Sequence, residues 1–245
     1  MNITFGNLDN TGERILLEKE TPLMIARHFC AYKFAKDYVA GKEVLDIGCG
    51  EGYGSYCLSG YAKKVTGLDY DKDVIAYAKE KYPKSNLDFL VMDVSNLELL
   101  KHEFDIICSF QNIEHIRDDK GLLLNINKIL KQGGSFICST CNRLDASPGR
   151  DTPSNKFHVR EYLVDEFKSL LNTVFAEVEI FGLKRGAKLN FYRWLKKAGL
   201  CNILPRRINP VVKFYENANT QDFILDEKSL DRALDFIAVC RKKKC

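Results

Sequence analysis

The sequence predicts an α/β protein with a doubly wound, mostly parallel seven-stranded sheet and helices on both faces. Short apolar segments alternate with helical ones along most of the chain, the spacing of βαβ units. The apolar segments are mostly rich in β-branched residues, as in strands that are covered on both faces. The chain has 245 residues, 45% of them hydrophobic, enough for one well-buried domain with an appended piece.

The predicted elements follow in a regular order. A first helix begins near Thr21-Pro22, a cap residue followed by proline, and ends at Gly41. Seven strands are expected after it: Glu43–Ile47, Lys64–Leu68, Leu87–Met92, Phe104–Phe110, Ser135–Thr140, Ala176–Phe181 and Phe236–Cys240. The helices between them are Tyr53–Leu58, Lys72–Lys81, Asn96–Lys101, Lys120–Leu130 and Tyr162–Leu171.

This order divides the chain into four parts. Residues 1–41 are predicted to form an N-terminal helical cap, and residues 42–182 the ligand-binding core. Residues 183–234 separate the last two strands and are interpreted as a basic helical insertion or lid. Residues 235–245 return to the core as its final strand.

A glycine-rich turn follows the first strand, with glycines at 48, 50, 52 and 54. Glycines there let a ligand approach the backbone near a helix N-terminus. The dinucleotide pattern G-x-G-x-x-G is not met, because Tyr53 occupies its third glycine position. Asp46, two residues before the turn, would repel a pyrophosphate but suits a ligand with cationic ammonium and sulfonium groups.

Three further sites fall at the ends of the next strands. Asp69, in the segment GLDYD, can accept both hydroxyls of a ribose. Asp93 and Val94 can bind an adenine amino group and flank its ring. Gln111 lies at the mouth of the crevice, where open α/β sheets bind ligands.

Five segments in register resemble the seven-stranded class I S-adenosylmethionine-dependent methyltransferases: VLDIGCGEGYG, GLDYD, VMDVSNL, FDIICSFQNIEHI and LKQGGSFICST. The resemblance covers residues 40–140 and implies an antiparallel final strand. It also implies S-adenosylmethionine as cofactor, S-adenosylhomocysteine as product, and a site formed by Asp46, Gly48, Cys49, Gly50, Asp69, Tyr70, Asp93, Val94 and Gln111. The alternative is a doubly wound domain that binds another nucleotide.

Two histidines are predicted near the transferred methyl group. His115 follows the fourth strand, and His158 lies just past the fifth. A histidine titrates near neutral pH and suits a general base; the alternative is that both only bind loop backbone. Relatives that carry E-x-x-E-H after the fourth strand bind Mg²⁺, but Gln111 replaces the first carboxylate here. We therefore predict no metal, although Glu114, His115 and His158 could ligate a cation.

The segment SPGRDTPSNKFHVREY resembles a bacterial and archaeal subgroup associated with surface-glycan and other glycosylation pathways, with departures at Cys141 and Lys156. That resemblance implies O-methylation of a sugar or other small polar hydroxyl acceptor. Two alternatives remain: an RNA or protein methyltransferase that uses the basic insertion, and a cofactor-binding protein without catalysis.

The insertion is strongly basic. Nine Lys and Arg residues and no acidic residue lie between Leu183 and Tyr215. A helix around Trp194 mixes apolar and basic residues, so we expect either a lid over the acceptor or contact with an anionic or membrane surface through 183–215. No nucleic-acid recognition module is visible.

Nine cysteines lie singly in apolar segments, apart from the pair Cys138 and Cys141, and are expected to be reduced and structural. No segment has the layout of a signal peptide or the length of a membrane span. We therefore expect a cytoplasmic protein.

Overall fold

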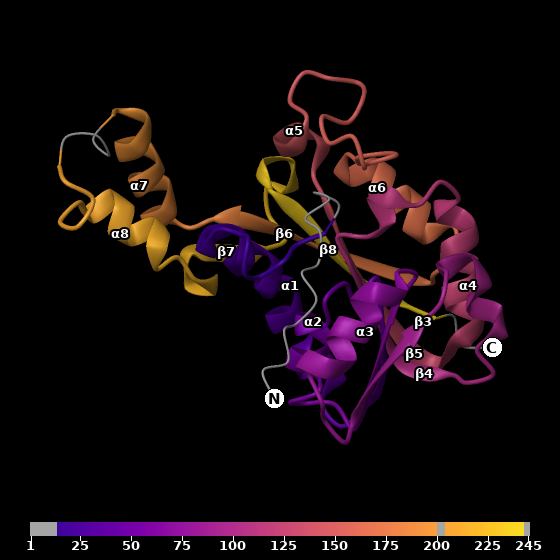
Figure 1. The fold of residues 1–245 in the computed structure, drawn as a ribbon. Coiled ribbons are helices and arrows are strands. Elements are labelled where there is room, and N and C mark those ends of the chain that lie inside the picture. The colour runs from indigo at the N-terminus through magenta and orange to yellow at the C-terminus, as the bar shows by residue number, and fades with distance from the viewer. Residues whose placement is uncertain (1–13, 200–203, 243–245) are drawn as a thin grey trace, which may run out of the picture.

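The computed structural model describes residues 14–199 and 204–242. One sheet runs through the molecule in the order β3-β2-β1-β4-β5-β8-β6-β7 (Figure 1). The strands are β1 (Glu43–Ile47), β2 (Lys64–Asp69), β3 (Leu87–Val91), β4 (Phe104–Phe110), β5 (Leu130–Cys141), β6 (Glu177–Arg185), β7 (Phe223–Asp226) and β8 (Asp235–Arg241).

Strands β1 to β5 are parallel to one another. The final strand, β8, inserts between β5 and β6 and is antiparallel to both, which confirms the expected direction of the last strand. The prediction of seven strands is wrong, because β7 is an eighth. It pairs with the extension of β6 from Gly182 to Arg185. Strand β7 is only four residues long and lies far along the chain from its partner. Its alternation of apolar and polar residues is too short to predict a strand from sequence.

The helices are α1 (Pro22–Val39), α2 (Tyr53–Leu58), α3 (Lys72–Lys81), α4 (Asp119–Ile129), α5 (Arg143–Ala146), α6 (Val164–Asn172), α7 (Ala187–Lys197) and α8 (Pro210–Glu216). Short 3-10 helices cover Val94–Leu99 (η1), Ile113–His115 (η2), Thr220–Asp222 (η4) and Leu230–Arg232 (η5). The predicted α-helix at Asn96–Lys101 is thus the 3-10 helix η1. The predicted helix to Leu130 ends one residue earlier, because Leu130 already pairs with Phe104 of β4.

The sheet is covered on both faces, as predicted. Alternation along β1 sends Leu45 to a cluster that includes Ile126 of α4 and Phe167 of α6. Val44 points the other way, into a cluster that includes Ala35 of α1 and Ile75 of α3. These clusters hold the parallel strands rigidly, so the loops at their carboxyl ends keep fixed positions.

Helix α1 joins the N-terminal part to the core at two places. Arg27 forms a bidentate ion pair with Asp235 of β8, with both N–O distances at 2.6 Å. Further along, the ring of Tyr32 packs edge-on against Phe110 and reaches over α2. A Cβ at Gly54 of α2 would lie 1.9 Å from that ring, so only glycine fits there.

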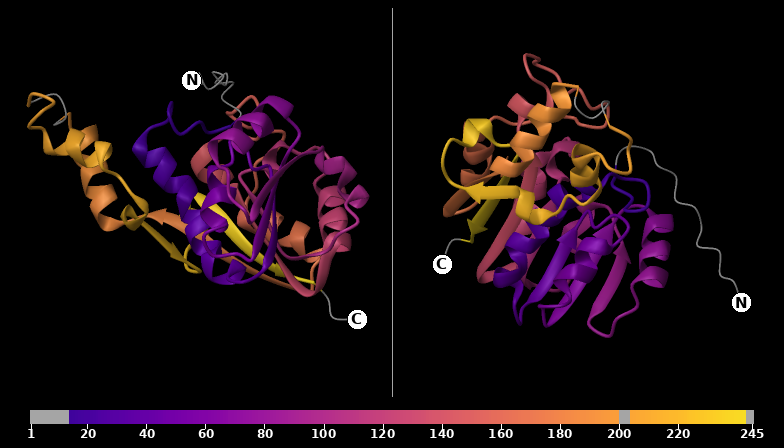
Figure 2. Two further views of the ribbon diagram at one scale, coloured as in Figure 1. Left: turned by 60° about the horizontal axis from the view of Figure 1, so that its bottom comes forward. Right: turned by 90° about the vertical axis from the view of Figure 1, so that its left-hand side faces the viewer.

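Residues 183–234 contain the end of β6, then α7, α8 and β7. In both figures α7 and α8 stand away from the layered core as an arm beyond the β6–β7 edge (Figure 1; Figure 2, left). Within residues 14–199 and 204–242, no helix has the length and apolarity that a membrane span requires.

The contact of Gly54 with Tyr32 makes a testable prediction. Gly54→Ala should lower the free energy of unfolding by roughly 1–3 kcal/mol, because the added methyl overpacks a buried ring that cannot move. Urea unfolding measures the change. In a Tyr32→Ala background the same substitution should cost nothing further, since the ring is gone. An equal loss in both backgrounds would show that the contact is not the cause.

Candidate active site

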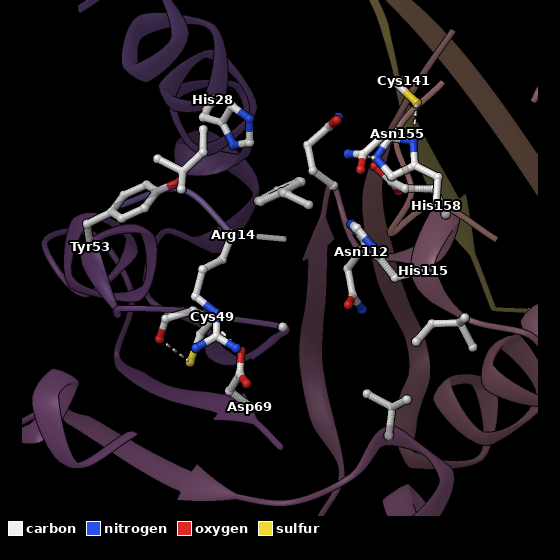
Figure 3. Close-up of a pocket in the computed structure, with 18 of the residues that line it drawn as sticks. Arg14, His28, Cys49, Tyr53, Asp69, Asn112, His115, Cys141, Asn155 and His158 are labelled. Carbon is white, nitrogen blue, oxygen red and sulfur yellow. Dashed lines mark hydrogen bonds between the residues drawn. The ribbon is translucent and has the colours of Figure 1, made fainter. Parts of the chain in front are cut away.

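A cavity of about 570 Å³ opens at the carboxyl ends of β1, β2 and β4. Ligand-binding clefts of this kind typically measure ~300–1,000 Å³. In Figure 3, Cys49 and Asp69 lie at one end of this cavity and Asn155 and His158 at the other. The cavity therefore has two ends with different chemistry.

The glycine turn forms the wall at the first end. Gly48 and Gly50 have φ values of 72° and 53°, in the left-handed region that favours glycine. A Cβ at Gly48 would meet the Asn112 side chain at 2.8 Å, so the turn can lie against the end of β4 only without one. At Gly50 nothing lies within 4 Å of an added Cβ. The backbone of Gly50 is therefore open to a ligand.

The carboxylate of Asp69 closes the same wall. It accepts hydrogen bonds from the backbone amides of Gly50 at 3.0 Å and Asp71 at 3.1 Å, which fix its orientation. Burial raises the pKa of Asp69, and the two amide bonds oppose this rise. Tyr70, next along the chain, lines the cavity and is 57% exposed.

The remaining predicted cofactor residues, which follow β3 and β4, also line the cavity. Asp93 caps η1 by accepting a hydrogen bond from the Ser95 amide, which lowers the pKa of its carboxyl. Gln111 has φ 50°, an uncommon value for a residue with a side chain, and such strain concentrates at functional sites. Its backbone amide donates to the Ser139 carbonyl at 3.0 Å, so the strained turn is held by β5.

Asp46 is the exception among these residues. It is fully buried behind the turn and is not part of the cavity wall. Its Oδ2 accepts a hydrogen bond from the Ser55 hydroxyl at 2.6 Å. Burial raises the pKa of Asp46 to about 7, partly offset by the Ser55 bond. The structure thus brings eight of the nine predicted cofactor residues to the cavity and leaves Asp46 beneath them.

His115 and His158 meet at the second end of the cavity. Their rings pack edge-to-face with centroids 5.0 Å apart, although 42 residues separate them in the chain. Nδ1 of His115 lies 3.0 Å from the Phe157 carbonyl oxygen. A carbonyl can only accept, so Nδ1 of His115 carries the proton and, in the neutral ring, the lone pair is on Nε2.

His158 is oriented by two side chains. Its Nδ1 lies 2.8 Å from Oε1 of the buried Glu161, and its Nε2 lies 3.0 Å from Nδ2 of Asn155. The Asn155 amide can be assigned, because its Oδ1 accepts from the Phe157 amide and Nδ2 must therefore face the ring. The neutral ring of His158 accordingly donates through Nδ1 to Glu161 and accepts through Nε2.

Glu114 lies directly behind the two histidines. Its side chain is buried and accepts a hydrogen bond from the Thr140 hydroxyl at 3.1 Å. Burial raises the pKa of Glu114 to about 8, with smaller contributions from Asp235 and Glu161. Glu114 is therefore mainly protonated at neutral pH.

Helix α1 supplies lining residues that sequence reasoning missed, among them Arg27, His28 and Tyr32. Burial lowers the pKa of His28 to about 4, so this ring is neutral. In the sequence, His28 falls on the apolar face of the first predicted helix. A histidine at such a position was the signal that could have pointed to this part of the site. Arg14, just before α1, also lines the cavity and pairs with Asp71 at 2.7 Å.

Two groups of side chains in this region have donor atoms close enough to hold a metal ion. Glu114, His115 and His158 form one group, and Cys141, His158 and Glu161 the other; within each, the donor atoms lie within 4.8 Å of one another. Both groups depend on His158, so they are alternatives. The expectation that no metal is used stays a prediction.

Comparison with known proteins identifies the class. A family model for a methyltransferase domain matches residues 45–138. A probable S-adenosylmethionine-dependent methyltransferase from Mycolicibacterium smegmatis is 39% identical over 182 residues, covering 73% of this chain and 70% of that relative. The chain belongs to the S-adenosylmethionine-dependent methyltransferases. It is a methyltransferase that uses S-adenosylmethionine as its cofactor.

Solved structures share the fold. A possible histamine N-methyltransferase from Thermotoga maritima superposes with a TM-score of 0.64 and 17% identity, over 90% of this chain and 91% of that one. The N-methyltransferase NodS from Bradyrhizobium japonicum, in complex with S-adenosyl-L-homocysteine, gives 0.61 and 17%, over 92% and 90%. At 17% identity, the structural similarity to these two proteins establishes the Rossmann-like fold and no more.

The buried carboxyl of Glu114 predicts a pH dependence of stability. The folded chain keeps this proton up to about pH 8, whereas the unfolded chain loses it near the usual pKa of about 4.3. Between these values the unfolded state binds fewer protons, so the free energy of unfolding falls as pH rises, by at most about 1.4 kcal/mol per pH unit for one group.

Glu114→Gln should flatten that decline, because the amide does not titrate. Urea unfolding at pH 5, 6, 7 and 8 measures both slopes. Burial also raises the pKa of Asp46, so the Glu114→Gln variant should keep part of the decline of stability with pH. Glu103→Gln, at an exposed position, is the matched control and should keep the full slope. If Glu114→Gln declines as steeply as the wild type, Glu114 is ionised in the folded chain.

Proposed function

We propose that this methyltransferase transfers the methyl group to a hydroxyl of a sugar or another small polar acceptor. The observation that supports this is the Glu161–His158 pair beside His115 at one end of the cavity. A hydroxyl must lose a proton as it attacks, whereas an amine needs only to be neutral. A buried carboxylate that orients a histidine is the arrangement of a general base.

In this proposal the first end of the cavity holds the cofactor. The open backbone at Gly50 and the oriented carboxylate of Asp69 fit an aminoacyl group and a ribose, and Asp93 with Val94 would hold the adenine. Several carboxyl groups line or underlie the cavity, which suits a cationic ligand. When bound, S-adenosylmethionine supplies an electrophilic methyl group on a sulfonium.

The second end of the cavity, where His158 and His115 lie, accepts the proton of the acceptor hydroxyl in this proposal. The acceptor hydroxyl replaces the Asn155 amide at Nε2 of His158 and gives its proton to that nitrogen as its oxygen bonds to the methyl carbon. S-adenosylmethionine, when bound, would supply the leaving group, because its sulfur would keep the electron pair of the broken carbon–sulfur bond. Glu161 stabilises the imidazolium through Nδ1. His115 holds the acceptor oxygen in line, which lowers the entropic part of the barrier.

Asp69 and Gly50 give a test of the cofactor site. Asp69→Asn should weaken binding of S-adenosylhomocysteine about tenfold, because a charged acceptor becomes a neutral amide. Gly50→Val should abolish it, since a branched side chain at φ 53° strains the turn and fills the open space. Isothermal titration calorimetry measures both. Asp88→Asn, on an exposed position of β3, should bind normally; undiminished binding by Asp69→Asn and Gly50→Val would place the site elsewhere.

His158 gives a test of the proton acceptor. His158→Gln should lower kcat by about 10²–10⁴ without changing the affinity for S-adenosylhomocysteine. Formation of S-adenosylhomocysteine is assayed with simple methyl glycosides as acceptors, and with aliphatic amines in parallel. Glu161→Gln should lower kcat less and shift the pH profile, because Glu161 acts through the ring of His158.

His102→Gln is the matched control, because His102 is exposed and pairs with Glu43 far from the cavity. It should leave kcat unchanged. Preferential methylation of the amines, or full activity of His158→Gln on a glycoside, would refute a hydroxyl acceptor with His158 as base.

A further inference from the structure

The arm formed by α7 and α8 lies outside the site described above. None of its described residues lines the large cavity. The arm packs on the core through a small cluster, in which Leu189 of α7 and Phe214 of α8 pack with Ala26 of α1. Lys188 of α7 also pairs with Asp222 of η4, with 3.7 Å between Nζ and Oδ1. The arm therefore projects two short helices away from the layered core (Figure 1).

The inner face of α7 accounts for its stability. Leu189 is 2% exposed, and the ring of Tyr192 stacks on Phe214 with centroids 4.2 Å apart and planes at 4°. Lys196 lies over the ring of Tyr215, with its Nζ 4.8 Å from the centroid. These contacts hold α7 against α8, so the apolar residues on the opposite face of α7 are not needed for packing.

That opposite face is apolar and open. Ala187, Phe191, Trp194 and Ala198 recur at helical spacing, and all four are exposed. Phe191 is 55% and Trp194 62% exposed, and their rings stack on each other with centroids 6.4 Å apart. The turn before α8 adds two more exposed aliphatic side chains, Leu204 at 45% and Ile208 at 61%. Large apolar side chains that gather on one exposed helix face, as Phe191 and Trp194 do, mark a binding surface.

The segment that contains the arm is also rich in cations. Residues 183–215 contain nine Lys and Arg residues and no Asp or Glu. Four of them pair with carboxylates: Lys184 with Asp226, Arg185 with Asp145, Lys188 with Asp222 and Arg206 with Glu216. Lys197, Arg207 and Lys213 are exposed. A helix with tryptophan and phenylalanine on one face and flanking lysines and arginines has the composition of helices that lie in the interface of an anionic bilayer.

We propose that the arm binds the surface of a membrane that contains anionic lipids, inserting Phe191 and Trp194 between the headgroups. Two observations favour a bilayer over nucleic acid. The exposed apolar set includes the aliphatic Leu204 and Ile208, which cannot stack on bases, and the two aromatic rings already stack on each other. Binding through this surface does not require that the acceptor be a sugar.

Trp194 reports on this surface directly, because it is the only tryptophan of the chain. The full-length protein is mixed with vesicles of phosphatidylcholine alone or with ~30% phosphatidylglycerol. With the anionic vesicles the Trp194 emission should shift to shorter wavelength, the protein should co-sediment, and added salt should weaken binding. Neutral vesicles should bind more weakly.

Variants separate the apolar and charged contributions. Phe191→Ala with Trp194→Ala should lower co-sedimentation about tenfold, whereas Tyr61→Ala, which removes an aromatic ring of 52% exposure outside the arm, should not. Lys197→Glu should weaken binding, and Lys101→Glu, a charge reversal outside the arm, should have less effect. Methyl transfer in the absence of vesicles should be the same for all four.

Several results would overturn the proposal. One is absence of binding to anionic vesicles, or full binding by the double variant. Another is a concentration-dependent shift of Trp194 emission without vesicles, with dimers in sedimentation velocity, which would assign the surface to a second copy of the chain. A shift on adding S-adenosylhomocysteine alone would indicate a closing lid. Quenching by single-stranded RNA without vesicle binding would indicate nucleic acid.

Discussion

The loop that carries His158 is held against the end of β4 by the backbone carbonyl of Glu114, which accepts hydrogen bonds from the amides of Val159 at 2.8 Å and Arg160 at 3.2 Å. The Phe157 carbonyl binds the ring of His115 in the same contact. Residues 155–161 have no regular secondary structure of their own. These bonds and the ion pair of Arg160 with Asp119 position the loop so that the two histidines meet.

The side chain of Glu114 is buried at the same place, which carries an electrostatic cost. Its carboxyl lies near Asp235 and Glu161, and Asp235 is neutralised by Arg27 of α1. Protonation of Glu114, which its raised pKa describes, avoids placing another negative charge in the same region. At the other end of the cavity the carboxylate of Asp69 lines the wall, and a negative group there suits a cofactor that carries a positive charge.

The N-terminal helix contributes more to the site than a cap would. Through the Arg27–Asp235 pair it is tied to the final strand, and through Tyr32 it packs over α2 and the end of β4. Residues of α1 thus form part of the cavity wall, and the ion pair with the final strand fixes their position. The arm has the opposite character: it rests on the core through a small cluster and keeps an apolar face in solvent, which makes it a surface for recognition.

Much of the fold could be predicted from local pattern, because strands buried on both faces form apolar runs and the turn after β1 requires glycines at Gly48 and Gly50. The same reasoning placed Asp69 and Gln111 at the carboxyl edge of the sheet. It could not find β7, whose four residues become a strand only by pairing with the end of β6. It expected the Asp46 carboxylate in the site, and the structure buries that group against Ser55.

Only part of the acceptor end of the cavity could be predicted from the sequence. His115 and His158 were expected near the methyl group from their positions after β4 and β5. Their contact, the orientation of His158 by Glu161 and the entry of α1 into the cavity wall all depend on residues far apart in the chain. Periodicity and turn chemistry act over a few residues and therefore determine elements. Burial and pairing between distant segments decide which side chains meet and which titratable groups are protonated. Both burial and pairing exist only in the folded structure.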